Sequence, residues 1–311
     1  MSQKLPTTLQ EAIQYFADPE RCLVFAVAMR WPQGPTCPKC YSQEHRFIKT
    51  RTVWVCKRCQ KHYSVKVGTI FEDSPIKLDK WLCAMWMMVN AKNGISSYEV
   101  HRALGVTQKT AWFMLHRLRL ALQKGSIDRK LMGDVEVDET YIGGQARNMH
   151  HDKQMKMKKT EGFFRKAVVI GMLERKGEVR TAVLARASTK LIEKAVKEHV
   201  VPGSNLYSDE AKAYDKVGKE YAHQVINHAE TYVKGNVHTN CIENFWSLLK
   251  RGIKGTYVSV EPFHLFRYLD EQSFRFNTRK DNDQGRFMSA LSQISGKRVQ
   301  YKALIGQTTW N

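Results

Sequence analysis

The stretch D-V-E-V-D-E-T-Y-I-G-G at residues 134–144 alternates apolar and polar side chains, which is typical of a half-buried β-strand that ends at a glycine turn. Side chains two positions apart share one face of a strand, so Glu136 and Asp138 lie together, as does Asp134, whereas Glu139 points the other way. Asp138 is central in this strand and directly precedes the turn. We therefore take Asp138 as the first candidate for a functional carboxylate.

The segments that follow this strand predict the rest of an α/β core. The expected strands are residues 167–173, 180–184 and 205–208, and the expected helices are residues 190–199, 210–217, 239–252 and 262–276. Three strands, a helix, a fourth strand and further helices is the order of an RNase H-like fold, in which helices flank a mixed sheet. Residues 145–166 hold seven Lys/Arg against two acidic residues, which predicts a basic insertion loop that either clamps DNA or is merely solvated.

Two further acids occupy positions suited to metal binding. Asp209 stands where a strand passes into a helix, and Glu243 lies beside the apolar stripe of the helix at residues 239–252. Metal-assisted phosphodiester chemistry needs carboxylates that converge on two divalent ions. Lys250 follows Glu243 by two helical turns, so one face presents a metal ligand and a phosphate contact. Taken singly, each acid could also be an exposed or capping residue, and Glu243 with Lys250 an ordinary surface pair.

Two C-x-x-C pairs predict a zinc site near the N-terminus. Cys37 and Cys40 are separated by 15 residues from Cys56 and Cys59, and residues 46–55 between the pairs resemble the strands of a hairpin. This spacing is typical of a structural zinc ion with four thiolate ligands, which leaves no position open for water. The alternative is a pair of disulfides or free thiols, and a reducing cytosol disfavours disulfides. The remaining cysteines have apolar neighbours and are expected to be buried packing residues: Cys22, Cys83 and Cys241.

A helix-turn-helix is predicted after the cysteine-rich segment. Helical patterns cover residues 8–29, with an interruption at Asp18-Pro19, and residues 76–91, 96–104 and 107–122. A short helix, a turn containing Gly105 and a longer helix form the DNA-binding arrangement whose second helix enters the major groove. Gln108, Lys109 and Thr110 would face base edges, and Arg117 and Arg119 would lie nearer phosphates or in the packing. An ordinary helical bundle is the alternative.

Composition points to a nucleic-acid partner. The 311 residues include 50 Lys+Arg and 30 Asp+Glu, a formal net charge of +20, and 42% hydrophobic residues, enough for a folded core in two or three domains. A basic surface also suits an anionic membrane or solubility alone. The longest apolar runs, residues 22–29 and 81–89, are too short to span a bilayer, and the first residues lack the apolar core of a signal peptide. We therefore expect a cytosolic protein.

The acids and their surroundings resemble a known enzyme family. Asp138, Asp209 and Glu243, with 70 and 33 residues between them and Lys250 after them, resemble the D-D-E-K pattern of bacterial insertion-sequence transposases. The strings D-E-T-Y-I-G-G, Y-S-D-E, H-T-N-x-I-E-N-F-W-S-L-L-K-R-G-I-x-G-T-Y and R-F-N-x-R are similar to its ISXO-like branch, over about residues 10–280. Some members of the family have Asn at the third position, and His238 and Asn240 also stand close to it in sequence.

This resemblance implies an activity and its cofactors. It implies an RNase H-like catalytic domain in which Asp138, Asp209 and Glu243 hold two Mg²⁺ or Mn²⁺ ions, and cleavage and joining of DNA at transposon ends. Lys250, Arg251 and Lys254 would contact backbone phosphates. The DNA partners would be terminal inverted repeats and target DNA, bound by a homodimer or larger assembly at the bacterial nucleoid in the cytoplasm.

The expected architecture is multidomain α+β. Its segments are an N-terminal helical segment (1–30), a zinc ribbon (31–72), a helix-turn-helix domain (73–126), the catalytic domain (127–280) and a C-terminal helix with a tail (281–311). Two other functions use parts of the same architecture. A non-mobile DNA-binding regulator would need none of the three acids, and an RNase H-like nuclease would cut DNA without joining it. An RNA-binding ribbon protein is a weaker third alternative because a helix-turn-helix favours duplex DNA.

Overall fold

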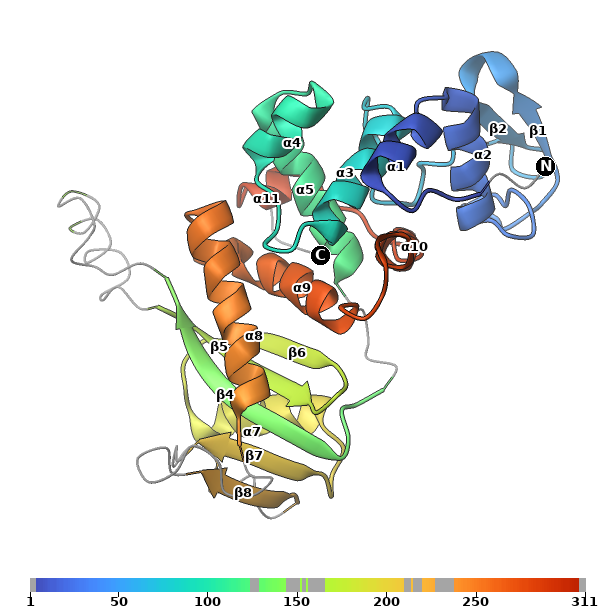
Figure 1. Cartoon of the computed structure of the whole chain (residues 1–311). Helices are drawn as coiled ribbons and strands as arrows, with labels where there is room; N and C mark the ends of the chain where they lie inside the picture. Colours follow the sequence, from blue (N-terminus) through green and yellow to red (C-terminus); the bar gives the residue numbers. More distant parts are fainter. Residues whose placement is uncertain are drawn as a thin grey trace. The chain divides into compact units, whose positions relative to one another are not determined.

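The computed structural model (Figure 1) describes residues 4–123, 129–143, 166–209, 220–226 and 238–307, with the single residues Asp152, Met155 and Tyr214. Contacts divide the chain into two compact units. Unit 1 contains residues 1–123 and 278–311, and unit 2 contains residues 124–277. Within the described ranges, no helix combines the length and the apolar character that crossing a bilayer requires.

Unit 1 begins with two helices, α1 (Leu9–Phe16) and α2 (Pro19–Arg30). Thr8 and Glu11 form a capping box at the start of α1. The side chain of Asp18 accepts the Glu20 N–H, and Pro19 occupies the first helical position of α2. These caps explain the interruption that the sequence predicts at Asp18-Pro19.

A three-stranded antiparallel sheet of unit 1 carries the cysteine pairs. Its strands, in the order β1-β2-β3, are β1 (His45–Ile48), β2 (Val53–Cys56) and β3 (His62–Tyr63), with the 3-10 turn η1 (Lys49–Arg51) between the first two. Trp54 on β2 is buried and packs against the rings of Trp31 and Tyr63. The predicted hairpin at residues 46–55 is confirmed.

Three helices follow the ribbon: α3 (Leu78–Asn90), α4 (Ser97–Leu104) and α5 (Gln108–Leu122). Ser96 and Glu99 form a capping box on α4, and Thr107 caps α5 through the Thr110 N–H. Gly105 ends α4 in the left-handed conformation with φ 58°, which a glycine adopts at little cost. The short helix, the glycine turn and the longer helix lie where the sequence predicts a helix-turn-helix.

The C-terminal residues complete the core of unit 1. They form α10 (Asp283–Leu291) and α11 (Tyr301–Leu304). The buried Phe287 ring contacts the rings of Phe16, Phe25 and Trp86. Backbone hydrogen bonds join Ile70 to Ile294 and Gly296 to Gly68, at 3.0 and 2.9 Å. The segment that we expected to be a helix and a loose tail is therefore part of a packed core.

Unit 2 is built on a five-stranded mixed sheet of order β6-β5-β4-β7-β8. The strands are β4 (Asp134–Ile142), β5 (Ala167–Glu174), β6 (Val179–Leu184), β7 (Asn205–Asp209) and β8 (Ala222–Ile226). β4, β5 and β6 pair antiparallel, whereas β4, β7 and β8 pair parallel. This order and these directions are those of an RNase H-like sheet, as the sequence predicts.

Helices cover both faces of this sheet (Figure 1). α7 (Thr189–His199) shares one core cluster with Val135, Val137, Ile170 and Met172. α8 (Asn240–Arg251) and α9 (Leu265–Asn277) share the other cluster, which includes Val169 and Leu173. The alternation of β4 therefore directs Glu136 and Asp138 toward the α8 face, because Val135 and Val137 point to the α7 face.

Some elements of unit 2 differ from expectation or lie outside the description. β8 was missed, since it is a short edge strand in which Ala222, Gln224 and Val225 are exposed and His223 is only partly buried. α8 continues into a π-helical turn, η5 (Gly252–Tyr257), and a 3-10 turn, η6 (Pro262–His264), precedes α9. The predicted helix at 210–217 and the basic loop at 145–166 fall almost wholly on residues that the structure does not describe.

Candidate active site

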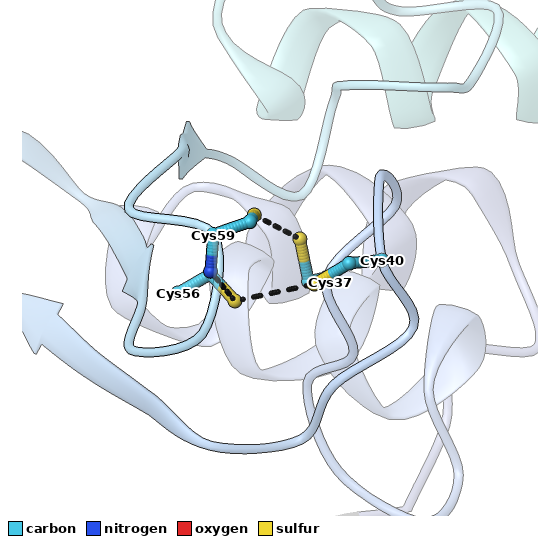
Figure 2. Close-up of side chains that lie close together, drawn as sticks. All are labelled: Cys37, Cys40, Cys56 and Cys59. Atoms are coloured by element: carbon cyan, nitrogen blue, oxygen red, sulfur yellow. Dashed lines mark hydrogen bonds between the residues drawn. The ribbon is translucent and has the colours of Figure 1, made fainter.

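The four paired cysteines converge in unit 1 (Figure 2). Their sulfur atoms all lie within 4.8 Å of one another, and the separations are 3.6 Å for Cys37–Cys59 and 3.5 Å for Cys40–Cys56. A disulfide needs about 2.05 Å, so these thiols are free. Four sulfurs at 2.3 Å from one zinc ion would be about 3.8 Å apart in a tetrahedron, close to the separations seen. The cluster fits a structural zinc ion.

The two C-x-x-C turns of this zinc site, here called knuckles, share one backbone conformation. The N–H of Tyr41 donates to the Cys37 carbonyl and that of Gln60 to the Cys56 carbonyl, at 2.9 and 3.0 Å. Tyr41 and Gln60 both have positive φ, 57° and 56°. In each knuckle the chain therefore reverses directly after the second cysteine and turns both sulfurs toward the same point.

Of the other cysteines, Cys22 and Cys83 are buried as predicted, whereas Cys241 is only partly buried.

Asp138 is held firmly on the α8 face of the unit 2 sheet. Its Oδ1 accepts the Glu139 N–H at 2.8 Å, and its Oδ2 accepts the Trp246 indole N–H at 2.9 Å. The residue opposite Asp138 on β5 is Gly171, and a methyl group there would meet Trp246 ring atoms at 2.5 and 2.7 Å. The bare glycine is therefore what lets the indole of α8 reach the carboxylate.

The other two predicted acids act on Asp138 electrostatically. Burial raises the pKa of the Asp138 carboxyl, and the negative charges of Asp209 and Glu243 raise this pKa further. Asp209 ends β7 and is exposed, and Glu243 is exposed in the first turn of α8, where its Oε1 accepts the Thr239 hydroxyl at 3.0 Å. The charges of Asp209 and Glu243 therefore lie near enough to Asp138 to act on it, although the oxygen atoms of the three carboxylates are not all within 4.8 Å of one another.

A fourth acid, Glu136, anchors the helix that carries Glu243. Its side chain is fully buried, and its Oε2 accepts the N–H groups of Cys241 and Ile242 at 2.9 and 3.0 Å. Its Oε1 forms an ion pair with Arg175 at 2.8 Å. A carboxylate at a helix N-terminus satisfies unpaired amides and complements the helix dipole. Glu136 therefore takes the place of an N-cap side chain for α8.

Glu136, His238 and Cys241 also form a group with metal-ligand atoms within 4.8 Å of one another. Both oxygens of Glu136 are already engaged, one by Arg175 and the other by two backbone amides. A cation there would have to displace the positively charged guanidinium. The contacts therefore match an electrostatic clamp, in which Glu136 holds the start of α8, better than a metal site. His238 Nδ1 lies 3.2 Å from Glu136 Oε1.

Comparison with known proteins supplies the family. Residues 130–277 match the model of the ISXO2-like transposase domain, and residues 17–62 match that of the transposase zinc-ribbon domain. The first range contains Asp138, Asp209 and Glu243, and the second contains all four paired cysteines. The chain belongs to the ISXO2-like transposases.

Two relatives agree with this membership. An uncharacterised protein in transposable element ISH50 of Halobacterium salinarum is 25% identical over 252 residues, which cover 77% of this chain and 84% of that protein. An uncharacterised transposase-like protein of Haemophilus influenzae is 29% identical over 120 residues, 38% of this chain and 94% of the relative. Membership of the family makes the chain a transposase, a class of DNA-binding and DNA-cleaving protein.

The predicted base-reading residues of the transposase lie at the start of α5. The Gln108 amide donates to the Ser97 hydroxyl at 2.9 Å, the Lys109 ammonium lies 4.8 Å from the centre of the Tyr301 ring, and the Thr110 N–H bonds to Thr107. These contacts hold the N-terminal turn of α5 in place. To read bases, Gln108 and Lys109 would exchange these partners for DNA.

Arg117 and Arg119 require a correction. Both side chains are buried, and Arg117 donates to the Val299 carbonyl and lies over the Phe113 ring. A phosphate contact needs a guanidinium at the surface, so the packing role is the one that their positions fit. Of the two roles that the sequence left open, the structure fits packing, because α5 is buried on more sides than a two-helix unit alone would bury it.

The basic residues after Glu243 are exposed. Lys250 and Arg251 end α8, and Lys254 lies in the π-helical turn η5.

Two residues that sequence reasoning did not select also shape the site, Glu136 and Gly171. The signals for them were present: Glu136 shares a strand face with Asp138, and a glycine within a strand often marks a close approach of another element.

Proposed function

We propose that this transposase binds the terminal inverted repeats of an insertion sequence and catalyses metal-dependent cleavage of DNA strands and their transfer into target DNA. The observation that carries the proposal is the electrostatic coupling of Asp138, on the central strand of an RNase H-like sheet, with Asp209 and Glu243. A bound cation would relieve the repulsion that these two negative charges exert on the Asp138 carboxylate. The donor set is all carboxylate, which suits Mg²⁺ or Mn²⁺.

Each residue has a distinct part in this proposal. Asp138, Asp209 and Glu243 would hold two divalent ions, which when bound activate the attacking oxygen and stabilise the leaving one. The Trp246 indole and the Glu139 amide fix the orientation of the Asp138 carboxylate. Lys250, Arg251 and Lys254 would bind phosphates of the strand that enters the site and keep its register.

Unit 1 would provide recognition of the DNA ends. The zinc ribbon and the helix-turn-helix would grip the inverted repeat, with Gln108, Lys109 and Thr110 at base edges and other basic side chains on phosphates. Cleaving and joining two transposon ends in one event needs two active sites. We therefore propose a dimer or larger assembly on DNA.

The test is strand transfer with a duplex that carries the inverted repeat flanking the coding gene. The expected result is Mg²⁺-dependent cleavage and a joined product for the natural protein, and loss of both for Asp209→Asn, with DNA binding retained. Glu193→Gln, which removes the charge of a partly exposed acid paired with Lys197, is the matched control and should keep full activity.

Two outcomes would overturn the proposal. Cleavage without any joined product would leave a nuclease, and binding without cleavage would leave a DNA-binding regulator. Equal activity of Asp209→Asn and the natural protein would instead remove Asp209 from the site.

A further inference from the structure

Tyr214 lies behind the proposed metal ligands, on the opposite face of the unit 2 sheet. It follows Asp209 by five residues and is buried in the core cluster that α7 shares with the sheet. Its hydroxyl donates to Glu139 Oε1 at 2.6 Å. Glu139 directly follows Asp138 on β4, and neighbouring residues of a strand point to opposite faces. The hydrogen bond therefore joins the residue behind Asp138 to a residue shortly after Asp209.

The backbone pairing between β4 and β7 ends before the two aspartates. The last pair of this parallel ladder is Glu136 with Tyr207, and no later pair joins the two strands among their described residues. Asp138 and Asp209 each follow this pair by two residues, so both carboxylates project from the same face just beyond the end of the ladder. No backbone pair between β4 and β7 therefore sets the separation of the two carboxylates.

Tyr214 also contacts β8, which lies on the other side of β7. Its ring packs against the His223 ring, with the ring centres 5.9 Å apart. His223 Nε2 lies 2.7 Å from Ser208 Oγ, and the buried Ser208 hydroxyl donates to the Asp209 carbonyl at 3.1 Å. Tyr214 thus reaches both neighbours of β7, β4 through a hydrogen bond and β8 through a ring contact.

The chemistry of Tyr214 suits a lasting hydrogen bond. Burial raises the pKa of its hydroxyl well above the usual tyrosine value, and the charge of Glu139 raises this pKa further. The hydroxyl therefore stays protonated at neutral pH and can donate. A hydrogen bond inside a protein is electrostatically stronger than one in water, so this one can hold two strand ends.

We infer that Tyr214 and Glu139 form a positioning pair that holds the ends of β4 and β7 together and sets the separation of the Asp138 and Asp209 carboxylates, an inference that rests on the proposed function. Two divalent ions about 3.5–4 Å apart need ligands at a fixed spacing. Without an ion, the negative charge of Asp209 repels that of Asp138, and the pair holds the strand ends against this repulsion.

The test is Mn²⁺ binding to the full, zinc-loaded chain without DNA, followed through the electron paramagnetic resonance signal of the free ion. The binding that Asp209→Asn removes reports the proposed site. Tyr214→Phe deletes only the hydroxyl and should raise the dissociation constant of this site by about 10-fold, the lower end of the effect of removing a group that orients a metal ligand. An unchanged Mn²⁺ affinity of Tyr214→Phe would overturn the inference.

Tyr221→Phe is the matched control. Tyr221 is buried in the same core cluster, and its hydroxyl donates to the Val200 carbonyl at 3.4 Å, so this variant loses a hydroxyl whose hydrogen bond does not reach β4. It should bind Mn²⁺ like the natural protein. An equal loss of Mn²⁺ affinity in Tyr221→Phe would show a general loosening of the core and would count against a positioning pair.

Variants of Glu139 separate positioning from direct metal binding. Glu139→Gln and Glu139→Ala remove the same charge, but only glutamine keeps an oxygen that can accept the Tyr214 hydroxyl. Glu139→Gln should therefore bind Mn²⁺ more tightly than Glu139→Ala does. Tyr214→Phe should have no further effect in the Glu139→Ala background, because the bond is already lost. Additive effects of these two changes would refute the pair.

Strand transfer by the natural protein in Mg²⁺ tests the proposed function separately. Joined products together with an unchanged Mn²⁺ affinity of Tyr214→Phe would overturn the inference alone. A Mn²⁺ site that depends on Tyr214, in a protein that does not cleave DNA, would overturn the proposed function alone. If Asp209→Asn removes no Mn²⁺ binding, the inference fails, and strand transfer still decides the proposed function.

Discussion

Replacing Gly171 with alanine should damage the candidate active site from the opposite strand. The added methyl group would lie 2.5 Å from Trp246 Cζ2 and 2.8 Å from Ile242 Cδ1. Ordinary contact begins near 3.4 Å, so the sheet and α8 would have to separate by 0.9 Å at the closest point. Trp246 is a buried residue of α8, so the whole helix must move or the indole must leave its place.

The magnitude follows from three contributions. Overpacking a core typically costs about 1–3 kcal/mol. Loss of the hydrogen bond from Trp246 to Asp138 adds about 1 kcal/mol, and the stiffer unfolded chain of an alanine variant offsets about 0.4–1 kcal/mol. The net loss is about 1–3.6 kcal/mol. For a unit of this size, residues 124–277, each kcal/mol lowers the melting temperature by about 2–4 °C.

Calorimetry of the full chain and a strand-cleavage assay would measure the two consequences. Unit 2 should melt about 2–14 °C lower by the scaling above. Cleavage should fall by about 100-fold, because a shift of about 1 Å in a catalytic group has that effect. Gly255→Ala is the control, since a methyl group at Gly255 meets nothing within 4 Å and its φ is not positive.

A double variant tests the cause. Trp246→Phe removes the indole atoms that collide with the new methyl group, so Gly171→Ala combined with Trp246→Phe should be more stable than the sum of the single losses predicts. An unchanged melting temperature for Gly171→Ala, or purely additive losses in the double variant, would refute this account of Gly171.

Three further predictions concern the clamp, the zinc ion and pH. Glu136→Gln should lower the free energy of unfolding by about 3–5 kcal/mol in denaturant titrations, because the mostly buried Arg175 guanidinium would lose the carboxylate that neutralises it. Atomic absorption should find one zinc ion per chain, and Cys56→Ser should abolish zinc binding and shift the melting of unit 1 to lower temperature. Because burial raises the pKa of Asp138, folding favours its protonated form: its contribution to stability is complete below the ordinary aspartate pKa of 3.8 and is lost as pH rises through the raised pKa. Mg²⁺ should therefore raise the melting temperature more at neutral than at mildly acidic pH, and an equal effect at both would contradict this electrostatic picture.

Local patterns in the sequence were sufficient for most elements. The alternation of residues 134–142 predicts a strand, and β4 spans Asp134–Ile142. The capping residues Ser96 and Thr107 predict the starts of two helices within one residue. These signals are local because a cap or a strand face depends on neighbours a few positions away. The cysteine spacing likewise sufficed for the zinc cluster.

Other features depend on contacts between distant parts of the chain. The sequence predicts the correct face of β4 for Glu136. It does not predict that Glu136 caps a helix, because the amides that it accepts belong to α8, more than a hundred residues later in the chain. Arg117 and Arg119 lie in a helix that other segments of unit 1 cover, and the sequence alone could not decide between phosphate contact and packing for them. β8 is a short exposed strand whose five residues carry little apolar pattern.

Unit 1 has a consequence for how the protein is made. Its core needs Phe287 from residues 278–307 to pack on Phe16 and Trp86, which are synthesised first. During translation the N-terminal helices therefore leave the ribosome well before the segment that contains Phe287. Their core stays incomplete until all of unit 2 has been synthesised. A chain cut short after residue 277 would contain every candidate catalytic acid yet lack a finished DNA-binding unit. If unit 1 holds the DNA ends as proposed, premature termination would yield a protein unable to hold them, rather than an uncontrolled DNA-cutting fragment.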